Sequence, residues 1–406
     1  MRERRSAILL ESPQRIEPAL LEDGLPPSVA DAVAELSAAA ATLGSALHPR
    51  SAASLAGLVR IMNAYYSNLI EGHNTRPRDI ARALAGDFDD DEGRRNLQAE
   101  AASHVCVQAL LDKRAAEGAP SEPASTAFIA DLHRAFYDGV PASMLQIKNG
   151  EHSYAMVPGE WRREDVHDVI VGRHQPPASR CVENFMEYFA WRYRFAPLGK
   201  ATRIVALAAA HHRLNYIHPF PDGNGRVSRL MSHAMAHEAG IGAHGLWSIS
   251  RGLARGLADR SDYKRMMDFA DTPRESDLDG RGNLSQRALT EFVLWFLRVC
   301  LDQVIFMSGL FELRQLVRRL RSYAENSEKL EAGAARLLEE AAVRGEFERG
   351  EAAKILAKPE RSARRVLTSV IDAGLLASDT QKGPVSLRFT MDGAEALFPR
   401  LFGENQ

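Results

Sequence analysis

The feature that most constrains this chain is a glycine-rich turn, residues 217–229, that lies between two amphipathic segments. Residues 200–216 repeat apolar side chains at helical spacing, and residues 226–239 do so again before Gly240. The sequence therefore predicts two helices joined by a loop, with Gly223 and Gly225 opening the second helix. We expect the fold around such a loop to be mainly helical.

The residue types in this loop indicate phosphate chemistry. The first N–H groups of a helix lack intrahelical partners, and glycine lets an anion approach them closely. Arg226 and Arg229 lie on one helix face and can both reach phosphate oxygens. Asp222 is suited to hold magnesium together with phosphates, and His218 to accept a proton near neutral pH. A capped, solvated helix start is the simpler alternative, but it leaves the base and the carboxylate unexplained.

The segment from His218 to Arg229 resembles the signature of the Fic family, His-x-Phe-x-(Asp/Glu)-Gly-Asn-Gly-Arg-x-x-Arg, with every fixed position filled. The resemblance implies a helical bundle that moves AMP from ATP to a protein hydroxyl, with Mg²⁺ as cofactor. It implies that His218 is the general base, Phe220 a core anchor and Asp222 the metal ligand. The implied nucleotide-binding residues are Gly223, Asn224, Gly225, Arg226 and Arg229. Relatives that phosphorylate carry Lys in place of Gly225, so the glycine favours nucleotidyl transfer.

A second informative stretch is residues 58–72, where apolar side chains at helical spacing end at Glu71-Gly72. The run from Ser67 to Gly72 resembles the inhibitory motif of Fic relatives, (Ser/Thr)-x-x-x-Glu-(Gly/Asn). The resemblance implies that Glu71 pairs with Arg229, because one guanidinium cannot hold both a carboxylate and the terminal phosphate of ATP. Without the core motif, Glu71 would read as an exposed acid at a helix end.

Residues 150–177 change in pattern, and Gly159–Arg162 with Val166–Val171 predict a short β-hairpin. The Fic family has such a flap over its active site, and it binds the target backbone as an added strand. Trp161 fits a core position equally well. The resemblance places the adenine near residues 245–268, although the tract 252–257 has two glycines and no asparagine.

The rest of the chain is predicted in outline. Residues 1–27 read as an irregular arm and residues 76–100 as a charged connector. The expected helices are 28–47, 97–111, 125–137, 180–195, a single helix from 245 to about 268, and another from 289 to 320. His233 and His237 have a zinc-like spacing but no evident third ligand, so we interpret them as surface histidines. Asp277–Leu284 resembles a calcium loop only faintly, and a turn before a helix is the better interpretation.

Residues 330–406 predict a separate small domain of three helices, 334–343, 350–356 and 361–373, with a β-wing after them. This order resembles a winged helix, which many proteins use on DNA. Basic residues lie near or on its third helix: Lys358, Arg361, Arg364 and Arg365. Because acids and bases nearly balance across the domain, we expect a protein contact or homodimer first and DNA second. The expected domains are 1–95, 96–325 and 330–406.

The whole chain sets further bounds. Its 406 residues carry a net charge of -2, which gives no global attraction to nucleic acid or membrane. Three cysteines without a metal pattern, no evident signal peptide and no apolar run of membrane-spanning length lead us to expect a cytoplasmic protein. The functional hypothesis is a protein adenylyltransferase that modifies Ser, Thr or Tyr of a target, the chain itself included. The alternatives are removal of AMP with the help of Glu71, and a transcriptional regulator with a sensory Fic core.

Overall fold

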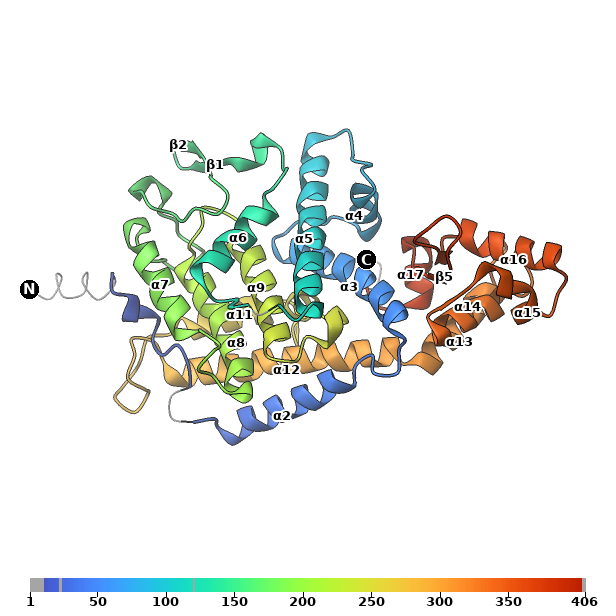
Figure 1. Ribbon diagram of the computed structural model, residues 1–406. Helices are drawn as coiled ribbons and strands as arrows, with labels where there is room; N and C mark the ends of the chain where they lie inside the picture. Colours follow the sequence, from blue (N-terminus) through green and yellow to red (C-terminus); the bar gives the residue numbers. More distant parts are fainter. Residues whose placement is uncertain (1–10, 22–23, 120, 404–406) are drawn as a thin grey trace, which may run out of the picture.

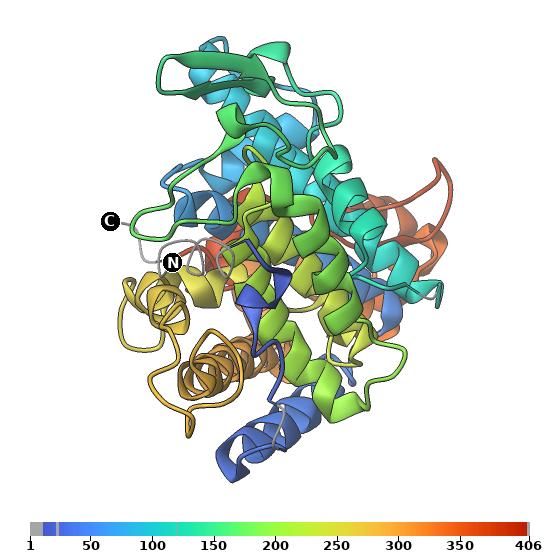
Figure 2. The same cartoon turned by 90° about the vertical axis from the view of Figure 1, so that its left-hand side faces the viewer.

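Helices form most of the computed structural model, which describes residues 11–21, 24–119 and 121–403. Figure 1 shows a helical bundle above the long helix α12 (Gln286–Phe311), with a small C-terminal domain at one side. Figure 2 shows α12 nearly end-on, with α2 (Pro27–Thr42) beside it and a β-hairpin at the opposite edge. The prediction of a mainly helical fold with small sheets is confirmed.

The N-terminal part supplies the helices that flank the glycine-rich loop. These are η1 (Pro13–Ile16), α2, α3 (Pro49–Ile70), α4 (Pro77–Leu84) and α5 (Glu92–Ala116). Helix α2 packs along α12, and α3 packs against α5 and α10. The predicted connector 76–100 is wrong in part, since it contains α4 and the first turns of α5. Asp91 ends that connector by accepting a hydrogen bond from the Arg94 backbone N–H at 2.9 Å, which starts α5. Part of the expected irregular arm, residues 1–10 and 22–23, lies outside the described residues.

The centre of the bundle is formed by α8 and the helices around it. The elements are α6 (Thr126–Phe136), η2 (Ala142–Leu145), η3 (Asp165–His167), η4 (Ser179–Cys181), α7 (Val182–Arg192), α8 (Lys200–Ile217), α9 (Asn224–Glu238), η5 (Ala243–Gly245), α10 (Ser250–Arg255), α11 (Asp262–Ala270) and α12. From Ile204 to Leu214 every residue of α8 is buried. Helix α8 contacts α9, α12 and α7, so the loop between α8 and α9 has a rigid base.

Helix α12 is long and apolar enough to cross a bilayer by length and composition, with a mean hydropathy of 1.6 over its best window. The expectation that no segment reaches this length is therefore wrong. In the structure α12 is a core helix, with Phe292 and Phe296 fully buried. Its charged residues fall on one exposed stripe, as in an amphipathic helix of a globular domain: Arg287, Glu291, Arg298 and Asp302.

The β-hairpin lies earlier in the chain than predicted. Strands β1 (Gln146–Asn149) and β2 (His152–Ala155) pair antiparallel, with Asn149 opposite His152 across a two-residue turn. The two turn residues are Gly150 and Glu151, and Gly150 adopts a positive φ of 61°, which suits a hairpin turn of this length. Residues 159–171 instead form a loop around η3. That segment turns inward because the Arg162 guanidinium, fully buried, binds acceptors in the bundle.

Two helices predicted as single are broken in the structure. The 245–268 segment forms α10 and α11, because Gly256 turns the chain at φ 68° and Asp262 accepts bonds from the Leu257 and Ala258 amides. The 289–320 segment forms α12 and α13 (Leu313–Glu325). Glu312 separates them, since its extended backbone ends α12 and its carboxylate caps the first amides of α13.

The C-terminal domain packs on α13 and on the start of α3. Its elements are α14 (Ala334–Arg344), β3 (Glu346–Phe347), η6 (Arg349–Glu351), α15 (Ala352–Leu356), α16 (Glu360–Asp372), β4 (Leu376–Ala377), β5 (Val385–Leu387) and α17 (Met391–Leu397). The three expected helices and the wing strands are present. A third strand, β3, joins the sheet in the order β3-β5-β4. Arg50, at the start of α3, contacts this domain through Glu346 and Asp379.

Candidate active site

The glycine-rich loop is held in one conformation by its own residues. His218 ends α8 in the left-handed conformation, and Gly223 starts α9 with a φ of 78°. The side-chain amide of Asn224 closes the loop: it accepts a bond from the Phe220 N–H and donates one to the Phe220 carbonyl, both at 2.8 Å. Asn224 thus shapes the predicted anion hole through its side chain as well as its backbone.

Phe220 anchors the loop to the bundle, as the resemblance implied. Its ring stacks on His133 at a centroid distance of 3.8 Å and lies 4.8 Å from Trp161. Phe220 is fully buried. The stacking fixes the loop between α6 and the segment that follows the hairpin, so His218 and Asp222 cannot move apart freely.

Arg162 is a residue that the sequence did not single out. Its guanidinium donates to the backbone carbonyls of His218 at 2.7 Å, Ile217 at 3.2 Å and Pro177 at 3.1 Å. Its own backbone N–H bonds to the Pro219 carbonyl at 2.8 Å. A buried arginine that satisfies several carbonyls holds the end of α8 in place, and no sequence pattern marks such a role.

The surroundings of His218 keep its imidazole neutral. Burial of the imidazole, together with the positive charges of Arg162 and His174, lowers the pKa of His218 to about 4. The ring is therefore neutral at pH 7 and has a lone pair available for a proton. The nearby carboxylates Asp222 and Glu71 act in the opposite direction and moderate the shift.

Asp222 lies at the rim of the loop, where its side chain is 48% exposed. Tyr137 donates its hydroxyl to the Asp222 carboxylate at 3.0 Å, and Arg226 lies 3.9 Å away. A half-exposed carboxylate oriented by a neighbouring hydroxyl fits a magnesium ion that takes its other ligands from phosphates and water. The donor set is hard oxygen, as Mg²⁺ requires.

Glu71 forms the contact with Arg229 that the inhibitory motif implied. Its Oε1 lies 2.6 Å from the Arg229 Nη2, and the Ser67 hydroxyl accepts from the Arg229 Nε at 2.9 Å. Burial raises the pKa of Glu71, but the charges of Arg229 and Arg226 outweigh burial and hold the pKa below its usual value. Arg229 is almost fully buried, so the ion pair fixes its guanidinium.

The Glu71 carboxylate reaches over the start of α9. A Cβ atom built on Gly225 would lie 2.5 Å from the Glu71 Oε1 and 3.0 Å from the Arg229 Nη1. Glycine is thus required at this position for the carboxylate to lie against the first turn of the helix. A carboxylate in this place stands where a phosphate group would meet the N-terminal amides of α9.

Arg226 is also paired with a carboxylate, which the sequence did not predict. Its Nη2 lies 2.8 Å from the Glu100 Oε2 on α5, and the His73 ring lies 3.3 Å from the same oxygen. Burial raises the pKa of Glu100 despite the charge of Arg226. Both motif arginines therefore have an internal anion in this conformation, and Glu100 is separated from Arg226 by too much sequence for a local pattern to reveal it.

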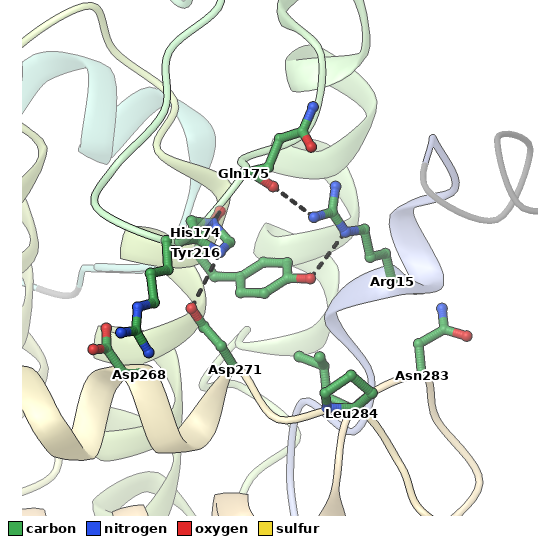
Figure 3. A pocket seen from close by; sticks show the side chains of 10 residues that line it. Arg15, His174, Gln175, Tyr216, Asp268, Asp271, Asn283 and Leu284 are labelled. Carbon is green, nitrogen blue, oxygen red and sulfur yellow. Dashed lines mark hydrogen bonds and ion pairs between the residues drawn. The ribbon is translucent and has the colours of Figure 1, made fainter.

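A cavity of about 510 Å³ adjoins the end of α8. Figure 3 shows Tyr216 and His174 at its centre and Asp271 below them. The His174 Nε2 bonds to the Tyr216 carbonyl at 2.7 Å, and its Nδ1 lies 3.1 Å from Asp271. Tyr216 lines the cavity from the end of α8, two residues before His218 in the sequence, whereas His218 and the rest of the glycine-rich loop are not among the lining residues. Its volume lies in the usual range for small-molecule sites.

The predicted surface position of His233 and His237 is wrong. His233 is buried on α9 and its Nε2 lies 2.7 Å from the Asp112 carboxylate on α5. His237 lies 3.0 Å from the same oxygen. Asp112 is thus the third potential ligand, which the sequence analysis did not find.

Comparison with known proteins bears on the loop and the helices around it. Residues 123–236 match the model of the Fic/DOC family. The chain carries a Fic domain. A protein adenylyltransferase Fic of Aedes aegypti is 39% identical over 88 residues, which are 20% of this chain and 16% of that protein. One of Nematostella vectensis is 36% identical over 92 residues, 22% of this chain and 20% of that protein. The match thus spans a fifth or less of these relatives.

Solved structures extend the likeness beyond the Fic domain. A Fic family protein of Desulfovibrio desulfuricans G20 superposes with a TM-score of 0.52 at 16% identity, covering 90% of this chain and 98% of that one. A Fic domain containing signaling protein of Bacteroides thetaiotaomicron gives a TM-score of 0.51 at 18% identity, covering 69% and 98%. At these identities the likeness shows the shared fold. The segment that matches the Fic/DOC model contains the glycine-rich loop from His218 to Arg229.

Proposed function

We propose that the protein is an adenylyltransferase that moves AMP from ATP to a hydroxyl side chain of a protein, and that Glu71 inhibits it at rest. The observation that carries this proposal is the Glu71 carboxylate, which lies on Arg229 and against Gly225. An internal anion at the start of α9 marks the place where an external anion binds.

The proposed reaction uses the site as follows. The phosphates of ATP bind the first amides of α9, with Arg226 and Arg229 on the outer phosphates once their carboxylate partners have moved. Asp222 would hold a Mg²⁺ ion, which neutralises phosphate charge when bound. The target oxygen attacks the α-phosphorus in line, the bond to the bridging oxygen of pyrophosphate breaks, and His218 takes the hydroxyl proton. The helix amides stabilise the charge that develops on phosphorus oxygens.

We further propose that the nucleoside of ATP lies in the cavity beside Tyr216. The support is its place at the end of α8, the helix that leads into the loop, and its walls, which offer an aromatic ring and both hydrogen-bond donors and acceptors. The end of α11 contributes Asp268 and Asp271, which agrees with an adenine near residues 245–268.

The hairpin β1–β2 is the proposed site for the target. It projects from the bundle, and the Asn149 side chain ties it to the carbonyls of Val166 and Asp168 at 2.8 Å each. An exposed strand edge held in this way can pair with an extended segment of another protein. Because such pairing uses backbone hydrogen bonds, it can align the target's hydroxyl side chain with little dependence on the target's sequence.

The first test is intact-mass analysis of the Glu71→Gly variant after incubation with ATP and Mg²⁺. We expect a gain of one or more AMP groups, absent in the Glu71→Gly/His218→Ala double variant and weak in the wild type. If the single variant gains nothing although ATP binds to it and candidate targets are supplied, the transferase proposal fails.

Glu71 also gives a reason to test the reverse reaction. A carboxylate beside the phosphate site, with its side chain 31% exposed, can orient a water molecule. Wild-type protein incubated with AMP-modified target should then release AMP, and the Glu71→Gly variant should not. Equal amounts of modified target with and without wild-type protein would exclude this activity.

For the C-terminal domain we propose a role in contacts with protein. Two of the basic residues near its third helix are already engaged: the Lys358 ammonium donates to the Ala332 carbonyl, and Arg365 lies 3.1 Å from Glu331. Glu331 reduces the positive field that DNA requires at Arg365, whereas the Ala332 carbonyl orients Lys358 without neutralising its charge. Salt-sensitive binding of a duplex by the full chain would instead favour the regulator hypothesis.

A further inference from the structure

Three side chains from two helices converge on one point that the proposed transfer reaction does not use. The Nε2 atoms of His233 and His237 lie 2.7 Å and 3.0 Å from the Asp112 Oδ1, and 3.2 Å from each other. The side chains of Asp112 and His233 are 7% and 5% exposed. Among the residues that the structure describes, this is the one group of three potential ligands close enough to share a metal ion.

We propose that Asp112, His233 and His237 form a structural zinc site. The two histidines are four residues apart on α9, so both rings point to the same side of the helix. The carboxylate comes from α5, which packs against α9. Two imidazole nitrogens and one carboxylate oxygen are ligands that Zn²⁺ takes readily, with water in the fourth position of a three-ligand site.

The separation of the two histidine nitrogens, 3.2 Å, favours an ion over hydrogen bonds alone, whereas the two shorter distances to the Asp112 oxygen fit both arrangements. The three ligand atoms form a nearly equilateral triangle, so two N–H groups would approach one oxygen from directions much closer together than its lone pairs. A tetrahedral ion with bonds of about 2.0 Å sets its ligands about 3.3 Å apart, close to the nitrogen separation in this cluster. An ion above the centre of the triangle would replace two crowded N–H···O contacts with three bonds to the ligand atoms.

Neighbouring residues orient the three side chains and enclose them. The Arg60 Nε donates to the Asp112 Oδ2 at 2.7 Å, which leaves Oδ1 directed at the histidines. Such second contacts orient a ligating carboxylate. The η5 turn covers the cluster closely: a Cβ on Gly245 would lie 2.9 Å from the Asp112 Oδ2, and one on Gly242 would lie 2.3 Å from the His237 Nδ1.

The position of the site gives the ion a structural role. His233 lies one helical turn beyond Arg229, so an ion on it holds the helix that carries the phosphate-binding arginines. Arg60 on α3 contacts the same carboxylate, and α3 carries Glu71 at its far end. Zinc would therefore stabilise the joint between α3, α5 and α9 without touching ATP.

The test is a zinc titration of tag-free, chelator-stripped protein against a chromophoric competitor. We expect the wild type to bind one tight equivalent, with affinity at least about tenfold weaker in His237→Ala and Asp112→Asn, since even an altered outer-shell contact costs that much. His152→Ala, which removes an exposed histidine from the hairpin, should bind like the wild type.

Thermal unfolding gives a second readout that does not depend on catalysis. Zinc should raise the Tm of the wild type and of His152→Ala, and leave that of His237→Ala unchanged. If His237→Ala does not fold, His237→Gln keeps the size of the side chain and takes its place. The proposal is overturned if the wild type binds zinc no more tightly than the Asp112→Asn or His237 variants, or if zinc does not change its Tm.

Discussion

At the scale of the residue, the site depends on groups whose proton affinity the bundle has altered. His218 is the clearest case, because burial and two positive neighbours lower its pKa to about 4. Arg162 lowers the pKa of His218 through its positive charge, although its hydrogen bond goes to the His218 carbonyl and not to the ring. A catalytic base with a low pKa is weak but fully available at neutral pH.

This shift leads to a prediction about pH. In the Glu71→Gly variant, kcat/KM should stay level as pH falls through about 6.5, where an ordinary histidine protonates. It should fall only near pH 4, because protonation of His218 removes the base. Loss of the Glu71 carboxylate lowers the pKa of His218 further, so the pKa in this variant is still below that of an ordinary histidine. The measurement is the rate of AMP transfer across pH, with circular dichroism to show that the fold persists. An acid limb near pH 6.5 would contradict it.

Gly225 supports a steric prediction. Alanine fits the helical backbone there, but its Cβ would occupy the space now taken by the Glu71 carboxylate. In a Glu71→Gly background, Gly225→Ala should therefore raise the KM for ATP at least about tenfold, the cost of roughly 1.4 kcal/mol of lost phosphate binding. Gly57→Ala in the same background is the control, since a Cβ on Gly57 meets nothing within 4 Å. Unchanged ATP kinetics would show that phosphate does not lie against this turn.

The sequence identified the residues of the loop but not those that support it. His218, Asp222 and the two arginines fall within a dozen positions, so local spacing was enough to group them. Arg162, Glu100 and Asp112 act on partners 56, 126 and 121 residues away. Only the packing of α5 and the 159–171 loop against the bundle brings them to the site, and no local pattern records that packing.

At the scale of the element, the errors of prediction have local causes. The hairpin was placed on β-branched residues such as Val166 and Val169, although the turn at Gly150-Glu151 marks it earlier in the chain. The helices after residue 245 were joined because periodicity continues across Gly256 and Glu312. In both cases a side-chain cap redirects the chain, and a carboxylate within an apolar pattern is easily taken for an exposed helical position.

Helix α3 supports a stability prediction, because it carries an interior glycine. Gly57→Ala should stabilise the protein by about 0.5–1 kcal/mol, since alanine loses less backbone entropy and meets no neighbour. Gly252→Ala on α10 should do the reverse, because its Cβ would lie 2.5 Å from the Val299 Cγ1 and 2.9 Å from the Gln303 Cγ. Urea denaturation of both variants measures the change in the free energy of unfolding. A change of the same sign in both variants would refute this account.

At the scale of the whole molecule, α3 joins two parts of the protein. Its first turn carries Arg50, which contacts Glu346 and Asp379 of the C-terminal domain. Its C-cap is Glu71, on Arg229. Twenty-two residues of helix span roughly 33 Å, so both contacts sit on one stiff rod. Movement at one end is carried to the other.

Reversing the charge at Arg50 tests this connection. Arg50→Glu would place an acid beside Glu346 and Asp379, and the repulsion should weaken the contact between the C-terminal domain and α3. We expect AMP transfer to rise in a protein that retains Glu71, and to show no further rise in the Glu71→Gly background. Both comparisons use the same labelling assay. An equal increase in the two backgrounds would mean that Arg50 acts on something other than the inhibitory contact.

In the proposed function, the α3 rod would separate the site of regulation from the site of the reaction. ATP and the target would meet at the loop, whereas a molecule bound to the C-terminal domain would act roughly 33 Å away, the length of the helix. Exchange of that domain for another would change the stimulus and leave the chemistry intact. One catalytic unit can in this way serve many signals in the course of evolution, with a single glutamate as the shared point of control.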